Sequence, residues 1–292
     1  TELSRLHWLF VIARGSSFRF RGADATLEEV RSKLNVQYCL TGIVEISGKT
    51  MSVSVELGDT QDRGIIWGER FRGDVGAVHE IRDSIINAVT SAVEVRIPFN
   101  EAQRARLKSP ENLDAWAAYH LGLQHMYRFN KPDNDLATSL FERAIKMEPG
   151  FARAYAGLSF THFQSAFLRY ADDTEATRLA QSYAAQCLER DPLDPFGHFT
   201  MGRAQWLRGD LEASIPWLER ANVLNPNYAQ ARYSRGWAET FLGSADASQA
   251  NIAAALALSP LDPFVYGMLG VRAMSHLVLG QSAQAADWGE RA

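Results

Sequence analysis

The chain has 292 residues, of which 46% are hydrophobic and 22% are charged, and its formal net charge is −4. This length and apolar content suffice for one large domain or two ordinary ones. The acidic balance excludes the basic footprint of a nucleic-acid-binding surface, so we expect no direct binding of nucleic acid. No apolar run approaches the roughly 20 residues that span a bilayer, and we expect no membrane insertion.

Two features of the sequence concern the redox compartment of the chain and whether it is part of a longer protein. Its two cysteines, Cys39 and Cys187, are too few for a secreted disulfide scaffold and fit a reducing compartment. The chain opens on Thr1 without an initiator Met and begins like the end of a helix. We therefore expect it to be a piece of a longer protein.

The first hundred residues alternate between strand and helix patterns. The apolar run Trp8–Ala13 predicts a buried strand, and residues 27–34 predict a short helix with Thr26 as its N-cap. Three further strands are predicted over 36–47, 50–57 and 65–71, with the clearest alternation of apolar and polar residues in the second. Helical spacing of Val and Ile predicts a helix over 77–95. We assign residues 1–98 to a small α/β module with one helical layer.

A 34-residue repeat determines the fold of the second part. Pro192, Pro226 and Pro260 follow one another at intervals of 34 residues, which is the length of a tetratricopeptide-repeat (TPR) helical hairpin. Residues 112–292 are therefore predicted to form an all-α TPR superhelix, an α-solenoid of about five hairpins of which the last is truncated. Residues 99–111 are expected to be a linker that contains a short charged helix. The whole chain is predicted to be an α+β module followed by TPR helices, and predominantly helical.

The repeats also predict where helices come close together. Gly202 and Gly236 occupy the same position in successive repeats, where the missing side chain lets two helices approach. One hairpin departs from the pattern, because Pro149 and Pro192 are 43 residues apart. We place this insertion around residues 168–175, between the two helices. A functional rim and a tolerated loop are both open interpretations, and the tolerated loop is the simpler one.

Two segments carry a family resemblance. Residues 3–18, Leu-Ser-Arg-Leu-His-Trp-Leu-Phe-Val-Ile-Ala-Arg-Gly-Ser-Ser-Phe, and residues 65–71, Ile-Ile-Trp-Gly-Glu-Arg-Phe, resemble the TolB amino-terminal-like module. In that family the module directly precedes TPR repeats, so the resemblance covers nearly all of this chain. It implies a bacterial regulator with either a class III adenylate or guanylate cyclase domain or a winged-helix DNA-binding domain, as in CadC-like transcriptional regulators. Cyclase-type parents imply the cytoplasm, whereas CadC-like parents imply a module in the periplasm.

The chain departs from the family at its start. The family module opens with a strand that reads roughly Ile-Ala-Val-Leu-Pro-Phe, and this chain begins within the helix that follows that strand. We expect the sheet to have an uncovered edge that invites pairing with a second copy. Neither output domain is present, so the resemblance assigns no cyclase or DNA-binding chemistry to any residue here.

The residues offer no catalytic or metal-binding constellation. His120 and His125 are five positions apart, so they point to different faces of a helix and do not form a metal-binding pair at i and i+4. Asp191 and Asp194 lie in a turn, where capping of the next helix explains them. No glycine-rich phosphate loop or nucleophile elbow occurs. We expect this chain to be no enzyme and to need no metal or cofactor.

The candidate functional surface is the concave face of the TPR superhelix, formed by the first helix of each hairpin. The candidates that face a partner-binding groove there are Phe160, Phe163, Arg203, Trp206, Tyr233 and Trp237. Aromatic residues with a single Arg are typical of interface hot spots, so we expect this groove to bind a protein or peptide segment. The alternative is that these rings pack between hairpins, and we favour that alternative for Phe196 and Phe199.

These observations predict a non-catalytic regulatory or protein-interaction region of a bacterial signalling protein. One alternative is a self-association module, in which a homodimer brings two output domains together. Another alternative is a sensor that binds a small ligand at the junction of the α/β module and the repeats.

Overall fold

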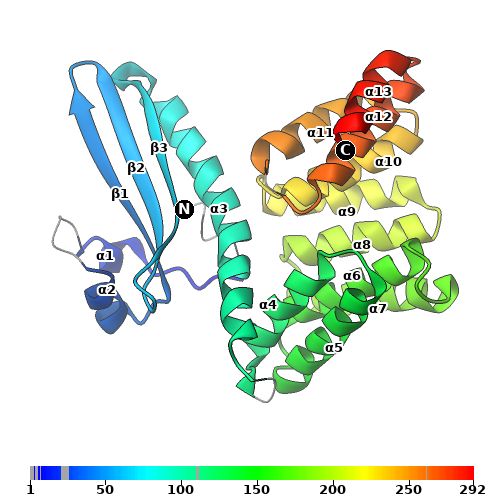
Figure 1. Ribbon diagram of the computed structural model, residues 1–292, viewed down its shortest axis with the longest axis horizontal. Helices are drawn as coiled ribbons and strands as arrows, with labels where there is room; N and C mark the ends of the chain where they lie inside the picture. The colour runs from blue at the N-terminus through cyan, green and yellow to red at the C-terminus, as the bar shows by residue number, and fades with distance from the viewer. Residues whose placement is uncertain (1–2, 4–5, 7, 21–25, 110–111, 261) are drawn as a thin grey trace. The chain divides into compact units, whose positions relative to one another are not determined.

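The computed structural model describes residues 3, 6, 8–20, 26–109, 112–260 and 262–292 (Figure 1). The chain forms two compact units, Thr1–Asn100 and Glu101–Ala292. Each unit has its own core of buried apolar side chains. The two units are described separately below.

A three-stranded antiparallel sheet forms the body of the first unit. Its elements are α1 (Arg14–Ser17), α2 (Leu27–Leu34), β1 (Tyr38–Ser47), β2 (Thr50–Asp59), β3 (Ile65–Asp74) and α3 (Val78–Arg106), and the strand order is β1-β2-β3. The alternation predicted for residues 50–57 is confirmed, because one face of β2 is buried and the other is not. The buried core joins Met51, Val53, Val55 and Leu57 of β2 to Ile81, Val89, Val93 and Ile97 of α3.

The start of the chain differs from the sequence prediction in one element. The strand predicted for Trp8–Ala13 is wrong, because none of these residues belongs to a strand. Phe10 is 90% exposed, whereas a central strand would bury it. Leu6 provides the buried contact instead, and the indole Nε1 of Trp8 donates to Glu94 Oε1 at 3.1 Å. The helix at 27–34 is confirmed, and the Thr26 hydroxyl accepts from the amide of Glu29, as expected for its N-cap.

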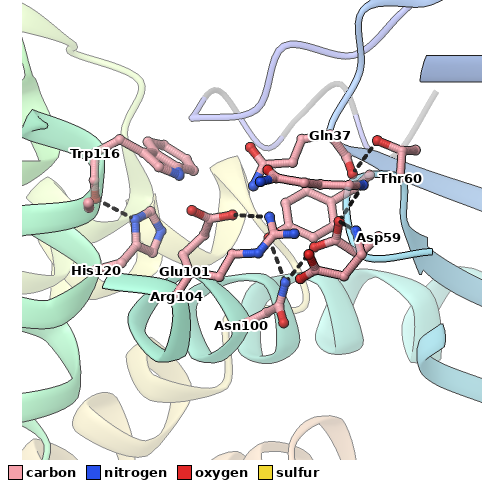
Figure 2. A network of polar contacts seen from close by, with 12 residues as sticks. Gln37, Asp59, Thr60, Asn100, Glu101, Arg104, Trp116 and His120 are labelled. Carbon is pink, nitrogen blue, oxygen red and sulfur yellow. Dashed lines mark hydrogen bonds and ion pairs between the residues drawn. The ribbon is translucent and has the colours of Figure 1, made fainter. Parts of the chain in front are cut away.

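Helix α3 is longer than the predicted 77–95. It continues to Arg106 through Pro98, so residues 99–106, which were expected to lie in a linker, are helical. A proline in a helix removes one hydrogen bond, but Ile97 and Ala102 on either side of it are buried, and this burial offsets the loss. Asn100 of α3 donates to Asp59 Oδ2 at 2.7 Å, and the two side chains point toward each other in Figure 2.

Ten helices of the second unit form five hairpins that stack in order (Figure 1). They are α4 (Ala115–Met126), α5 (Lys131–Met147), α6 (Ala152–Phe167), α7 (Asp173–Arg190), α8 (Pro195–Leu207), α9 (Leu211–Leu224), α10 (Ala229–Phe241), α11 (Ala245–Leu258), α12 (Val265–Val278) and α13 (Ser282–Arg291). The predicted TPR α-solenoid is confirmed. A Cβ added to Gly202 would lie 2.8 Å from Leu218, which confirms the close approach expected at that glycine.

The insertion in the second hairpin lengthens helices more than it lengthens a loop. Helices α6 and α7 have 16 and 18 residues, whereas α8 and α9 have 13 and 14. Only residues 168–172 lie between α6 and α7. The predicted placement of the whole insertion between the two helices is therefore wrong, because most of the additional residues continue the helical pattern on either side.

The first helices of the hairpins, α4, α6, α8, α10 and α12, pack against one another in succession. The stack curves toward this layer. The curvature brings the ring of Phe129, which follows α4, to within 5.1 Å of the ring of Phe264, which precedes α12. Gln230 of α10 also reaches the first hairpin, where its Nε2 donates to the Tyr127 hydroxyl at 3.3 Å. Side chains on this side of the layer therefore converge on one interior.

Candidate functional site

The interior of the TPR unit is filled by aromatic rings around one arginine. We call this set the inner cluster, and it consists of Phe160, Phe163, Phe199, Arg203, Trp206, Tyr233 and Phe264. All of these side chains are buried. They come from α6, α8 and α10 and from the residue that caps α12, so the repeat itself brings them together.

Arg203 is the centre of the inner cluster. Its guanidinium carbon lies 4.4 Å from the Trp206 ring centroid, and between 5.0 and 5.6 Å from the centroids of the other five rings. Its Nε donates to the Ser234 hydroxyl at 3.1 Å. Cation–π attraction can contribute about 2 kcal/mol at a desolvated contact, which offsets part of the cost of burying the charge.

Two donors in the inner cluster have no hydrogen-bond acceptor. They are Nη2 of Arg203 and Nε1 of Trp206, and neither finds an acceptor within the described part of the chain. Their side chains are only 4% and 7% exposed, so water compensates little. Burial lowers the pKa of the Arg203 guanidinium, and the neighbouring Tyr233 offsets part of that shift. A buried donor without an acceptor costs about 1–3 kcal/mol, so this arrangement destabilises the folded chain.

One end of the inner cluster continues into rings that are open to solvent. We call Phe167, Trp237 and Phe241 the aromatic rim. Trp237 stacks on Trp206 with ring centroids 4.1 Å apart, and Phe241 lies 4.4 Å from Trp237. Phe167 is 46% and Phe241 54% exposed, and Trp237 is half-buried between them. The rim is thus an exposed apolar surface on a buried base.

The structure brings all six candidate residues together. Phe160, Phe163, Arg203, Trp206 and Tyr233 belong to the inner cluster, and Trp237 belongs to the aromatic rim. Five of the six are buried against other rings, which is the packing alternative for most of their surface. Partner binding by these residues stays a prediction.

Four aromatic residues of the site were absent from the candidates, and one of them, Phe199, had been assigned to packing between hairpins. Phe167 follows Phe163 by four residues, and Phe241 follows Trp237 by four. Residues four apart share a helix face, so this spacing could have extended the candidates to the exposed end. Phe264 follows the same Asp-Pro dipeptide as Phe196, which shows that it holds the equivalent position.

The polar residues considered for chemistry have structural roles. The Asp194 carboxylate accepts from the amides of Phe196 and Gly197 at 2.6 and 3.2 Å, as expected for an N-cap. The Nδ1–H of His120 donates to the Trp116 carbonyl at 2.9 Å (Figure 2), and burial lowers the pKa of His120 to about 3. A histidine held neutral in this way does not titrate near neutral pH.

Neither a metal cluster nor a membrane-spanning helix is found in the described residues. Within those ranges, no group of three or more His, Cys, Asp or Glu side chains could hold a metal ion. No helix in the same part of the chain combines the length and the apolar character needed to cross a membrane.

Comparison with known proteins found similarity to one protein named as a putative adenylate cyclase and to solved structures of TPR proteins. No family model matches it. It is 28% identical over 214 residues to a protein of Rhizobium meliloti (strain 1021) named "Putative adenylate cyclase 3", an alignment that covers 71% of this chain and 36% of that protein. The chain therefore spans about a third of the length of this relative.

Similar solved structures are TPR proteins. A thermophilic TPR protein of Thermus thermophilus is 23% identical with a TM-score of 0.49, over 61% of this chain and 89% of that one. YrrB, described as a TPR protein with an unusual peptide-binding site, is 16% identical with a TM-score of 0.37, over 69% of this chain and 88% of that one.

Proposed function

We propose that this chain is the non-catalytic regulatory region of a bacterial signalling protein, and that its TPR unit binds a segment of a partner protein at the aromatic rim. The observation that carries the proposal is the exposure of Phe167 and Phe241, 46% and 54%, beside the stacked pair Trp206 and Trp237. Exposed rings on a buried, preorganised base are typical of interface hot spots. An apolar side chain of a partner that packs on Trp237 would bury this surface.

The apolar surface at these helix ends suits an elongated ligand. Helix α10 ends at Phe241, and the exposed residues Leu277, Val278 and Leu279 lie at the corresponding end of α12. α-Solenoids present extended surfaces across successive repeats, because each hairpin contributes the same helix end. An amphipathic helix or an extended apolar peptide matches such a row of anchors.

A peptide array tests the proposal without a known partner. The array carries random 12-residue peptides and is probed with the wild-type chain, with Phe241→Ser, and with the control Leu136→Ser. Leu136 is also exposed, at 45%, but lies on α5, the second helix of its hairpin. We expect the control to retain the wild-type set of bound peptides and Phe241→Ser to lose most of it. An array without binders, or one unchanged by Phe241→Ser, would contradict the proposal.

For the parent protein we propose an adenylate cyclase in the cytoplasm in preference to a CadC-like transcriptional regulator. The support is the Rhizobium meliloti relative, whose name is that of a cyclase. The expected role of this chain is to transmit partner binding to a catalytic domain elsewhere in the parent. Cyclic AMP formation by the full-length parent, measured with and without an array-selected peptide, tests this assignment. A parent without cyclase activity, or one that the peptide leaves unchanged, would contradict it.

Self-association is a second candidate function, and the exposed edge of β1 favours it. In the described residues β1 pairs only with β2. Leu40, Val44 and Ile46 each lie opposite a buried residue of β2, yet they are 38%, 60% and 64% exposed. The only charge on β1 is that of Glu45, whereas natural edge strands usually carry several charges that block pairing.

An antiparallel pairing of β1 with β1 of a second copy is self-complementary when it is centred on Ile43. That register places Leu40 opposite Ile46 and Gly42 opposite Val44 on the same face, and it opposes Glu45 to Thr41. Ile43→Cys in a Cys39→Ser background should then form a disulfide-linked dimer, because residue 43 meets its own copy. Ile46→Cys in the same background is the control and should not. A chain that light scattering finds monomeric at all concentrations would contradict this candidate.

A further inference from the structure

The unsatisfied donors of the inner cluster indicate what chemistry the partner brings. Arg203 contributes a charged Nη2 and Trp206 a neutral Nε1–H, and both lack acceptors in the described part of the chain. The guanidinium carbon lies 4.4 Å from the centroid of the Trp206 ring, so the two donors belong to side chains that are in contact. Native folds rarely leave two neighbouring buried donors unsatisfied without a functional reason.

We propose that Arg203 and Trp206 receive the carboxylate of a glutamate side chain from the partner segment, an inference that rests on the proposed binding at the aromatic rim. A neutral acceptor would satisfy the N–H groups and leave the buried charge uncompensated. A carboxylate supplies both acceptors and the opposite charge, and its geometry matches the guanidinium fork.

The position of the two donors favours glutamate over aspartate as the acidic residue of the partner segment. Trp206 stacks on Trp237 with an interplanar angle of 17°, and Trp237 belongs to the aromatic rim. Trp206 therefore lies one ring layer behind the surface where the partner packs, and Arg203 contacts Trp206. Glutamate reaches one methylene further than aspartate, and its stem can pass along the rings while its head meets the guanidinium.

The inference has a signature in the free protein. If Arg203 serves the ligand and not the fold, its removal should not destabilise the chain. Met has a similar length and no charge, and replacement of a buried charge by an apolar side chain of similar volume is often neutral or stabilising. We expect the Tm of Arg203→Met to equal or exceed that of the wild type. A fall in Tm of more than about 4 °C would show that the guanidinium packs structurally and would overturn the inference.

The binding experiment uses the peptides selected on the array. Each bound peptide is remade with Gln in place of Glu and titrated into the wild type, Arg203→Met and Arg203→Lys. We expect the Glu-to-Gln exchange to weaken binding to the wild type at least about tenfold, as for a desolvated charged hydrogen bond. The exchange should have no effect on Arg203→Met, and Arg203→Lys should retain part of the preference because it keeps the charge.

The other outcomes separate this inference from the function on which it rests. Peptides that bind the rim equally well with Gln would overturn the glutamate inference and leave the proposed function in place. Binding that is lost only when the peptide C-terminus is amidated would assign the carboxylate to a chain end and overturn the side-chain assignment. An array without any binder would overturn both.

Discussion

One glycine position recurs in three repeats with different surroundings, and it yields a matched set of substitutions. A Cβ on Gly202 would lie 2.8 Å from Leu218 Cγ, and a Cβ on Gly236 would lie 2.9 Å from Ile252 Cδ1. A Cβ on Gly270 would meet nothing within 4 Å. The last hairpin differs in its turn, because Gly270 lies ten residues before the turn glycine Gly280, whereas Gly202 and Gly236 each lie seven residues before theirs, Gly209 and Gly243. Alanine at Gly202 or Gly236 should therefore destabilise the unit, whereas alanine at Gly270 should stabilise it.

The magnitude follows from two opposing contributions. Alanine in a helix interior is favoured over glycine by about 1 kcal/mol. At Gly202 the added methyl falls roughly 0.7 Å short of an ordinary carbon–carbon contact with Leu218, a fully buried side chain, and such overpacking costs about 1–3 kcal/mol. We expect Gly202→Ala to destabilise the unit by up to about 2 kcal/mol, and Gly270→Ala to stabilise it by about 1 kcal/mol.

Urea and thermal unfolding followed by circular dichroism would measure the difference. A change of 1 kcal/mol corresponds to about 2–4 °C in Tm for a unit of this size. Leu218→Ala in the Gly202→Ala background should remove the clash and give a coupling energy of about 1–3 kcal/mol in a double-mutant cycle. Equal stabilisation by Gly202→Ala and Gly270→Ala, or the absence of coupling to Leu218, would refute the reasoning.

Three further predictions concern buried polar groups. Because the pKa of His120 is lowered to about 3 in the native state, the unfolded chain binds one more proton below its ordinary pKa of about 6.5. Stability should therefore fall by about 2–3 kcal/mol between pH 6.5 and pH 4.5, and urea titrations should show that His120→Asn reduces this fall. Asp194→Ala should cost about 2–4 kcal/mol, since it removes the N-cap of α8 and an ion pair with Arg153 at 3.4 Å, whereas Asp194→Asn should keep the cap and cost about half. Asn100→Ala should lower the stability of the first unit by about 1–3 kcal/mol, because Asp59 is buried and loses its 2.7 Å partner; an unchanged urea midpoint would contradict this role.

The repeat made the second unit predictable, because its signal is periodic and local. Proline spacing located the hairpins, and the glycine position located the close helix contacts. The first unit was predictable where a pattern belongs to one strand, as in β2. The strand predicted for residues 8–13 is absent because an apolar run forms a strand only when a neighbouring strand hydrogen-bonds to it. Phe10 in this run is exposed. The helix predicted for 77–95 was too short because the chain stays helical through Pro98, where buried residues on both sides stabilise the helix.

The sequence indicated which residues of the candidate site lie together, but not how deeply they are buried. All six candidate residues lie together, since helical spacing within one repeat places them on the first-helix layer. Their burial depends on Phe264, which reaches Phe160 and Tyr233 with ring centroids 6.0 and 5.6 Å away. That contact arises from the curvature of the stack over several hairpins. A single repeat contains no information on this curvature, so the sequence predicted an open groove where the structure has packed rings with an exposed rim.

Photo-crosslinking would test the central claim, that a partner segment binds at the aromatic rim, most directly. An array-selected peptide that carries a benzophenone group is irradiated with the wild-type chain, and mass spectrometry locates the attachment. We predict attachment at the ends of the first helices, at or beside Phe167, Trp237 and Phe241, and its loss when unlabelled peptide competes. Attachment to the second helices α7, α9 and α11, with the rim unmodified, would contradict the account.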